Sequence, residues 1–222
     1  MNLQHYMNKK FPTVKLTPSI YYQWETGIHF TLGENIYQFK KNDELNLDRF
    51  RLVYEQTTTI FNELFNQDDE LFLVTNIYKH KTKEKLTEKL KVYKSFLKYK
   101  NDLMKIHVKS YPYPFEMDEA EEYEMQQFSL KCKRKDFKVH QLLKAACNED
   151  FPLYPKLGGY SIDYPDVFFV NVTKDIIFFI YDDRGCEVIA HDVNKIRGLY
   201  EKYYDWVEDI DRKRIENGLG IK

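Results

Sequence analysis

Residues 167–190 read VFFVNVTKDIIFFIYDDRGCEVIA, in which short apolar runs alternate with the polar turns TKD and DDRG. Short apolar runs bounded by turn residues are typical of buried strands, and short turns favour antiparallel pairing of successive strands. The stretch therefore predicts a three-stranded antiparallel meander near the C-terminus. The rest of the chain is expected to be arranged around this piece of sheet.

Apolar residues after the meander recur every three or four positions from Ile196 to Ile210, which predicts an amphipathic helix packed on the sheet. Strands are predicted at residues 20–32, 71–78 and 123–133, and helices at residues 2–10, 47–66, 83–107 and 136–147. We therefore predict one α+β domain over residues 1–222, with a mainly antiparallel sheet of about six strands and flanking helices.

Two prolines interrupt the chain in the segment Tyr111-Pro112-Tyr113-Pro114-Phe115. Proline lacks a backbone donor and disfavours a helical conformation in the residue before it. A helix cannot continue through this segment, so residues 110–120 are the best candidate for a weak domain boundary.

The composition is that of an ordered globular protein, with 43% hydrophobic and 31% charged residues and a formal net charge of −1. The three cysteines, Cys132, Cys147 and Cys186, are far apart, which argues against disulfides and a zinc site and favours a reducing compartment. No apolar run is long enough to span a membrane, so we expect a cytoplasmic protein that does not enter membranes. No metal or cofactor is predicted.

Sequence signatures of nucleotide binding, zinc proteolysis or serine hydrolysis are missing, and no two of the six histidines are close in sequence. The best enzymatic candidate is a set of aspartates at the strand ends of the meander, namely Asp163, Asp166, Asp182 and Asp183. Acids gathered in loops could bind a metal or share a proton. However, Asp also favours turns because its side chain bonds to nearby backbone amides.

Charge is distributed in blocks. Residues 79–109 hold eleven lysines against three acids, and residues 110–128 hold six acids and no Lys or Arg. The blocks could be solvated faces, could neutralise each other across the fold, or could meet a partner. A nucleic-acid partner is disfavoured because the basic block lacks arginine and the adjacent acids would repel phosphate.

Aromatic residues make up 16% of the chain, including 18 Tyr and 16 Phe. Tyrosine has an apolar ring and a polar tip, which suits both core edges and protein contact surfaces. The candidate protein-binding residues are the aromatic segment and the acids that follow it: Tyr111, Tyr113, Phe115, Glu119, Glu121, Glu122 and Glu124.

Several long segments resemble an uncharacterised domain family of low-GC Gram-positive bacteria. These segments are YYQWETGIHFTLG at 21–33, FNELFNQDDELFLVTN at 61–76, FSLKCKRKDFKVHQLLKAACNEDF at 128–151, VFFVNVTKDIIFFIYDDRGCEVIA at 167–190 and LYEKYYDWVEDIDRKRIE at 199–216. The resemblance implies no catalytic residue. Family members look like the small cytoplasmic proteins that accompany polymorphic toxins, which implies an immunity role.

The leading hypothesis is therefore a non-enzymatic protein-binding module, in the form of an immunity protein that occludes a toxin. The alternative is an acid-dependent hydrolase or nuclease that uses the aspartates near the meander.

Overall fold

The computed structural model describes residues 1–82, 90–115, 121–158 and 164–221, and it contains one antiparallel sheet in the order β1-β7-β6-β5-β2-β4-β3. The predicted α+β class is confirmed, with seven strands in place of about six. The strands are β1 (Gly27–Thr31), β2 (Glu70–His80), β3 (His107–Pro112), β4 (Tyr123–Lys133), β5 (Asp166–Asn171), β6 (Ile176–Ile180) and β7 (Gly185–Ala190).

The predicted meander forms the middle of this sheet as β5, β6 and β7. Its side chains are almost entirely buried on both faces, which explains why the sequence shows continuous apolar runs there. Phe168 lies opposite Phe179 in the register, and their rings stack with centroids 4.4 Å apart. Cross-strand aromatic pairs of this kind hold the strands in register.

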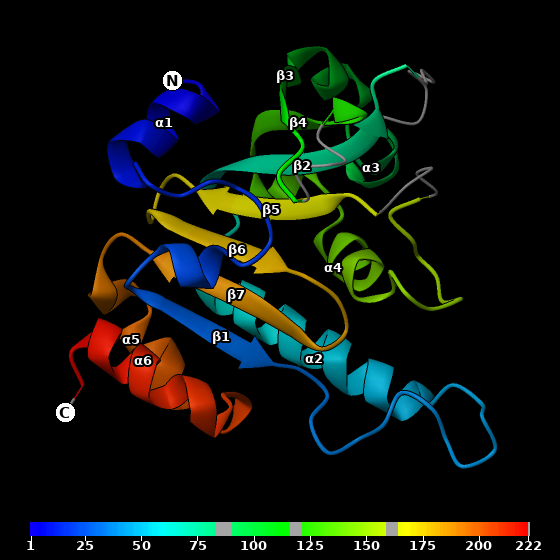
Figure 1. Ribbon diagram of the computed structural model, residues 1–222, viewed down its shortest axis with the longest axis vertical. Coiled ribbons are helices and arrows are strands. Elements are labelled where there is room, and N and C mark those ends of the chain that lie inside the picture. The colour runs from blue at the N-terminus through cyan, green and yellow to red at the C-terminus, as the bar shows by residue number, and fades with distance from the viewer. Residues whose placement is uncertain (83–89, 116–120, 159–163, 222) are drawn as a thin grey trace.

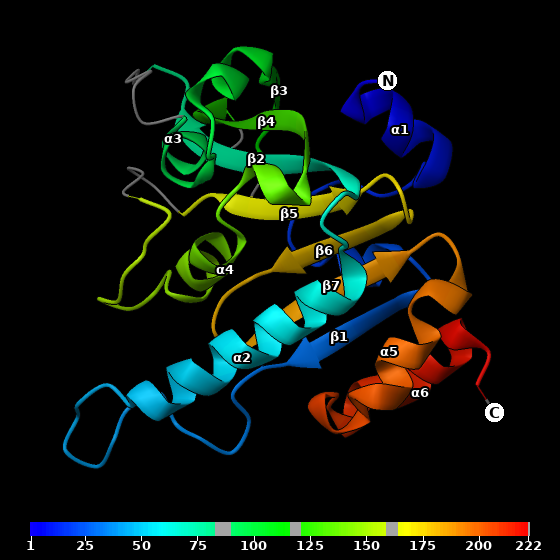
Figure 2. The same cartoon turned by 180° about the vertical axis from the view of Figure 1, so that it is seen from behind.

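One face of the sheet carries the larger core, covered by α2 (Leu47–Leu64) and α4 (Val139–Cys147), with α3 (Lys91–Phe96) beside them (Figure 2). Phe61 of α2 stacks on Phe65 at 4.3 Å and meets Phe169 of β5 edge-on at 5.1 Å. The prediction of a helix at 47–66 is confirmed, because its apolar spacing does form the buried face.

The opposite face carries a smaller core under α1 (Leu3–Lys10) and the 3-10 turn η1 (Ile20–Gln23) (Figure 1). Tyr6 and Phe11 are buried there against β2, β5 and β6. The helix α5 (Arg197–Lys202) and the helix α6 (Asp209–Leu219) lie beside β1, at the edge of the sheet. None of the helices in the described ranges is both long and apolar enough to cross a membrane.

The predicted strand at 20–32 is wrong in its first half. Ser19 adopts a left-handed conformation with φ 68°, and Ile20–Gln23 then form η1. The Tyr21 amide donates to the Glu187 side chain, and the Trp24 indole donates to the Ala190 carbonyl, so the chain is held by side-chain bonds until β1 begins at Gly27.

The predicted helix at 83–107 is confirmed only over Lys91–Phe96. Residues 83–89 lie outside the described residues, and beyond them only Lys91–Phe96 are α-helical. The chain becomes extended at Leu97, which bridges to Phe137, and a 3-10 helix η2 (Lys100–Lys105) follows. Residues 107–112 then form β3, the strand that sequence reasoning missed because it lies where a helix end and a proline segment were expected.

The helix predicted from Ile196 to Ile210 is divided. α5 ends at Lys202, a 3-10 turn η6 (Tyr204–Trp206) follows, and α6 begins at Asp209. Tyr203 and Trp206 stack at 4.5 Å inside the turn, and Val207 is buried. These contacts favour a bend that lays α6 against β1 instead of a continuous helix.

Candidate functional site

The aromatic segment 111–115 leaves β3 and packs around Tyr78 at the end of β2. The Tyr78 ring lies 5.8 Å from Tyr113 and 5.2 Å from Phe115, and Tyr113 also contacts Tyr123 of β4 at 5.7 Å. Phe115 is nevertheless 47% exposed. Two of the predicted contact residues, Tyr113 and Phe115, therefore form one packed cluster with Tyr78 and Tyr123, and Phe115 leaves part of it open to solvent.

A groove runs between this segment and α1. It has a volume of about 450 Å³, and its walls are Leu3, Gln4 and Met7 of α1, residues 14–17 and 111–114, and Met125 and Gln127 of β4. The Tyr111 hydroxyl and the Lys109 ammonium both donate to Gln4 Oε1, at 3.0 Å and 3.2 Å. We call this feature the edge groove, because it lies beside β3 at the edge of the sheet.

The described acids among the predicted contact residues, Glu121, Glu122 and Glu124, flank Tyr123 of β4, which contacts Tyr113 of the edge groove, and they differ in their own contacts. Glu124 forms an ion pair of 2.9 Å with Lys79, which faces it in the β2–β4 register, and Glu122 lies 3.7 Å from His80. Glu121 and Glu122 are exposed, whereas Glu119 lies outside the described residues. The acidic and basic blocks therefore meet on neighbouring strands and partly neutralise each other.

The aspartates of the enzymatic alternative lie in separate hydrogen-bond networks. Asp166 accepts from Asn76 at 3.2 Å and from the Tyr78 hydroxyl, and Asp182 pairs with Arg184. Buried Asp183 accepts from Arg49 Nε at 2.9 Å. Asp163 lies outside the described residues.

Burial raises the pKa of the Asp183 carboxyl, and Arg49 opposes that shift. Within the described ranges, no three His, Cys, Asp or Glu side chains are grouped to hold a metal. Each of the three described aspartates has a structural partner, and the geometry of the described residues gives the hydrolase alternative no support.

The cysteines are free thiols, and two of them are buried. Burial raises the pKa of Cys132 and of Cys147 to about 12. A nucleophilic cysteine acts as a thiolate, so these two thiols are not poised for catalysis at neutral pH.

A polar network that sequence reasoning missed joins β1 to α6. His29 Nδ1 lies 2.7 Å from Asp211 Oδ2, and His29 Nε2 lies 2.9 Å from the Tyr181 hydroxyl. Tyr181 reaches the histidine across Gly185, where any Cβ would lie 1.9 Å from the hydroxyl oxygen. Both ring nitrogens of His29 are occupied, so this histidine connects β1 to α6 and to Tyr181. No local sequence signal indicates the pairing, because His29 and Asp211 are 182 positions apart.

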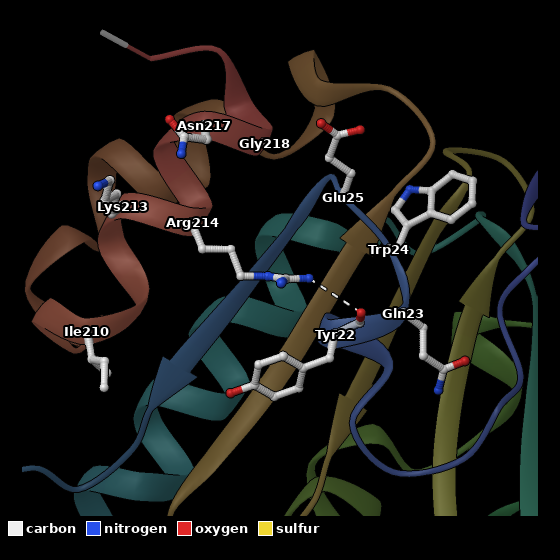
Figure 3. A pocket seen from close by; sticks show the side chains of 9 residues that line it. All are labelled: Tyr22, Gln23, Trp24, Glu25, Ile210, Lys213, Arg214, Asn217 and Gly218. Atoms are coloured by element: carbon white, nitrogen blue, oxygen red, sulfur yellow. Dashed lines mark hydrogen bonds between the residues drawn. The ribbon is translucent and has the colours of Figure 1, made fainter.

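Beside this network, a shallow pocket of about 600 Å³ separates residues 22–25 from α6 (Figure 3). Figure 3 shows Arg214 extending from α6 toward Tyr22, whose carbonyl it contacts at 3.4 Å. The Arg214 guanidinium also lies over the Tyr21 ring at 5.0 Å. Because Arg214 is engaged with the opposite wall, we interpret this pocket as the seam between α6 and the sheet.

The sequence of the chain matches a protein family and a homologous bacterial protein. Residues 3–211 match the model of a domain of unknown function, DUF3885. The chain belongs to this family. It is also 71% identical, over 209 residues, to the uncharacterized protein YnaE of Bacillus subtilis (strain 168), covering 94% of this chain and 98% of that protein. The predicted resemblance to an uncharacterised family of low-GC Gram-positive bacteria is confirmed, and no solved structure matches the chain.

Proposed function

We propose that the chain is a non-enzymatic protein-binding module whose edge groove takes an extended segment of another polypeptide. The observation that carries this proposal is the groove itself, which has apolar walls from α1 and an aromatic rim from the 111–114 segment. Concave, mainly apolar sites with a few polar groups are the usual form of a binding site.

The side chains of the groove suit polypeptide recognition. Met7 and Met125 are buried side chains that line the groove and can repack, and Tyr111 supplies a half-buried ring with a hydrogen-bonding tip. Gln4 and Gln127 also line the groove, where Gln4 holds Tyr111 and Lys109 in place and Gln127 donates to Asn76 at 3.1 Å. Tyrosine and methionine are enriched in protein interfaces, which supports this assignment.

The exposed acids near the groove favour a partner that carries basic residues. Glu121 and Glu122 are exposed beside the Tyr113 end of the groove, while Glu124 is already paired with Lys79. Complementary charge guides association and fixes the direction of a bound segment. We therefore expect a segment with apolar residues in the groove and Lys or Arg at the Tyr113 end.

The specific role that we propose is that of an immunity protein, which neutralises a toxin by occluding it in the cytoplasm. The support is the resemblance to proteins that accompany polymorphic toxins, together with an acidic surface that suits a basic cleft. The three free cysteines are consistent with a reducing compartment.

A random peptide library displayed on phage tests the binding module. We expect the full chain to select peptides that combine apolar and basic residues, and Tyr111→Ala to weaken their binding about tenfold because it removes the aromatic rim. The control is Tyr37→Ala, which removes a tyrosine that is 84% exposed and does not line the groove. The module is contradicted if no peptide is enriched or if both variants bind equally.

The immunity role has its own test, which is binding to a toxin-like protein encoded beside the gene for this chain. We expect a stoichiometric complex that Glu121→Gln and Glu122→Gln weaken together, because they remove the exposed acids. The immunity role is contradicted if no complex forms or if the double variant binds with unchanged affinity. The protein-binding module is then judged by the phage-display result alone.

A further inference from the structure

A third pocket, far more basic than the edge groove, lies between the end of α3 and the start of α4. Its volume is about 360 Å³, and we call it the α4 pocket. Its walls include Lys98, Arg134, Lys135, Lys138 and His140, and no Asp or Glu is among its described lining residues. Such a collection of like charges is unfavourable unless something compensates for it.

The chain itself supplies little compensation. Lys98 Nζ donates to the Lys135 carbonyl at 2.6 Å, Lys138 Nζ donates to the Ser95 carbonyl at 3.3 Å, and Arg134 donates to the Phe65 carbonyl. Of the four Lys and Arg side chains, only Lys135 forms an ion pair within the described part of the chain, with Asp68 at 2.7 Å. Neutral carbonyl groups therefore hold these cations in place without cancelling their charge.

Arg134 is the clearest example of a cation in this pocket whose charge is not cancelled. Its Nε is buried without a hydrogen-bond partner, and its guanidinium lies over the Phe61 ring at 5.4 Å. Burial lowers the pKa of Arg134, a shift that nearby Asp69 opposes. Its two terminal nitrogens donate to the neutral Phe65 carbonyl and Asn62 Oδ1, and among the described residues no carboxylate forms an ion pair with it, so its charge is left uncancelled and attracts anions.

The backbone adds to the positive field. α4 begins at Val139, its N-cap residue Lys138 makes no side-chain cap, and its first turn holds no acid. The first amide groups of a helix lack partners within the helix, and they carry a partial positive charge. The Val139 amide already donates to the Phe137 carbonyl at 3.1 Å and the Gln141 amide to the Lys138 carbonyl at 3.1 Å, so the helix start would act on an anion mainly through its partial positive charge.

We propose that the α4 pocket binds a phosphate group. A phosphate has enough charge to balance several cations and enough oxygen atoms to accept from the lysines and from Arg134, and the positive end of the α4 dipole favours it further. The pocket is larger than the group itself, which leaves room for the remainder of a phosphorylated small molecule. This site is independent of the edge groove and of the protein-binding proposal.

Titration of the ¹⁵N-labelled full chain with inorganic phosphate and with AMP, at constant ionic strength set by chloride, tests the site. We expect saturable shifts of the amide resonances of Val139 and His140 for both ligands. The double variant Lys98→Ala/Lys138→Ala should weaken phosphate binding about tenfold, since it removes two cations at the pocket. The control is Lys94→Ala/Lys100→Ala, which removes two exposed lysines that do not line the pocket.

Each outcome is decisive. Equal affinity for both ligands supports recognition of the phosphate group alone, and tighter binding of AMP supports a larger phosphorylated ligand. The proposal is overturned if phosphate causes no saturable shift, or if the control double variant weakens binding as much as the pocket variant. Circular dichroism of both variants verifies that they are folded, and the conservative variant Lys138→Arg should retain binding.

Discussion

The two edges of the sheet are built differently. At the β1 edge, α6 covers the strand: Asp211 bonds to His29, and Glu208 accepts from the Thr31 hydroxyl at 3.2 Å. At the β3 edge, the strand pairs with β4 alone among the described residues, and His107, Val108, Lys109 and Ser110 are all exposed.

An uncovered edge strand is a site for unwanted pairing, and proteins protect such edges with charges or proline. β3 has both, in Lys109 and Pro112, whereas β1 is protected by a helix. The contacts of α6 therefore stabilise the β1 edge, whereas the β3 edge carries the surface for which we propose recognition. The following predictions test this division from the largest expected effect to the smallest.

Gly218→Ala should disrupt the covered edge. A Cβ at this position would lie 2.2 Å from the Glu25 carbonyl oxygen, so α6 must move away from the sheet. We expect a loss of about 3 kcal/mol in the free energy of unfolding, measured by urea denaturation. Gly198→Ala in α5 is the control, because no atom lies within 4 Å of its Cβ and alanine favours the helix. Equal stability of the two variants would show that α6 is not tightly docked.

Glu187→Gln should change how stability at the covered edge depends on pH. Glu187 is buried in β7, and burial raises the pKa of its carboxyl above that of the unfolded chain. The folded state therefore binds the proton more tightly, and this group loses its contribution as pH rises through the raised pKa. Glutamine does not ionise and can still accept from the Tyr21 amide.

We expect the variant to gain stability relative to the wild type as pH rises from the usual glutamate pKa of about 4.3 toward neutrality. Urea denaturation at several pH values measures this difference. Glu201→Gln, at an exposed position in α5, is the control. A constant difference between wild type and Glu187→Gln over this range would contradict the expectation.

Tyr111→Ala should have the smallest effect on stability, although it lies at the surface that we assign to recognition. The side chain is half-buried, and within the described ranges its hydroxyl bonds only to Gln4, in an exposed position. We expect a loss of less than about 1 kcal/mol in the free energy of unfolding, measured by urea denaturation. A loss as large as that of Gly218→Ala would mean that the β3 edge is structural, and the division between the two edges would fail.

Sequence patterns predict well those elements that depend on local contacts. The meander and α2 have short turns or regular spacing, and their positions are close to the predicted ones. The errors lie where distant residues decide the backbone. Leu97 becomes extended because it bridges to Phe137, and β3 forms because β4 pairs with it.

The candidate sites also differ in how far the sequence predicts them. The aromatic segment and its acids could be identified from the sequence, but only the structure shows that α1 completes a groove with them and that Lys79 neutralises Glu124. The α4 pocket was not predicted, although its lysines are visible in the sequence. Its basic character depends on which of them have a carboxylate partner, and that is a property of the fold.

The sequence by itself determined the α+β class, the central meander and the alternation of basic and acidic blocks, because these follow from the chemistry of neighbouring residues. The tertiary structure decided which sheet edge is covered, which charges cancel and where cavities remain. The physical reason is that contacts such as that of His29 with Asp211 join positions 182 residues apart, and no local pattern encodes them.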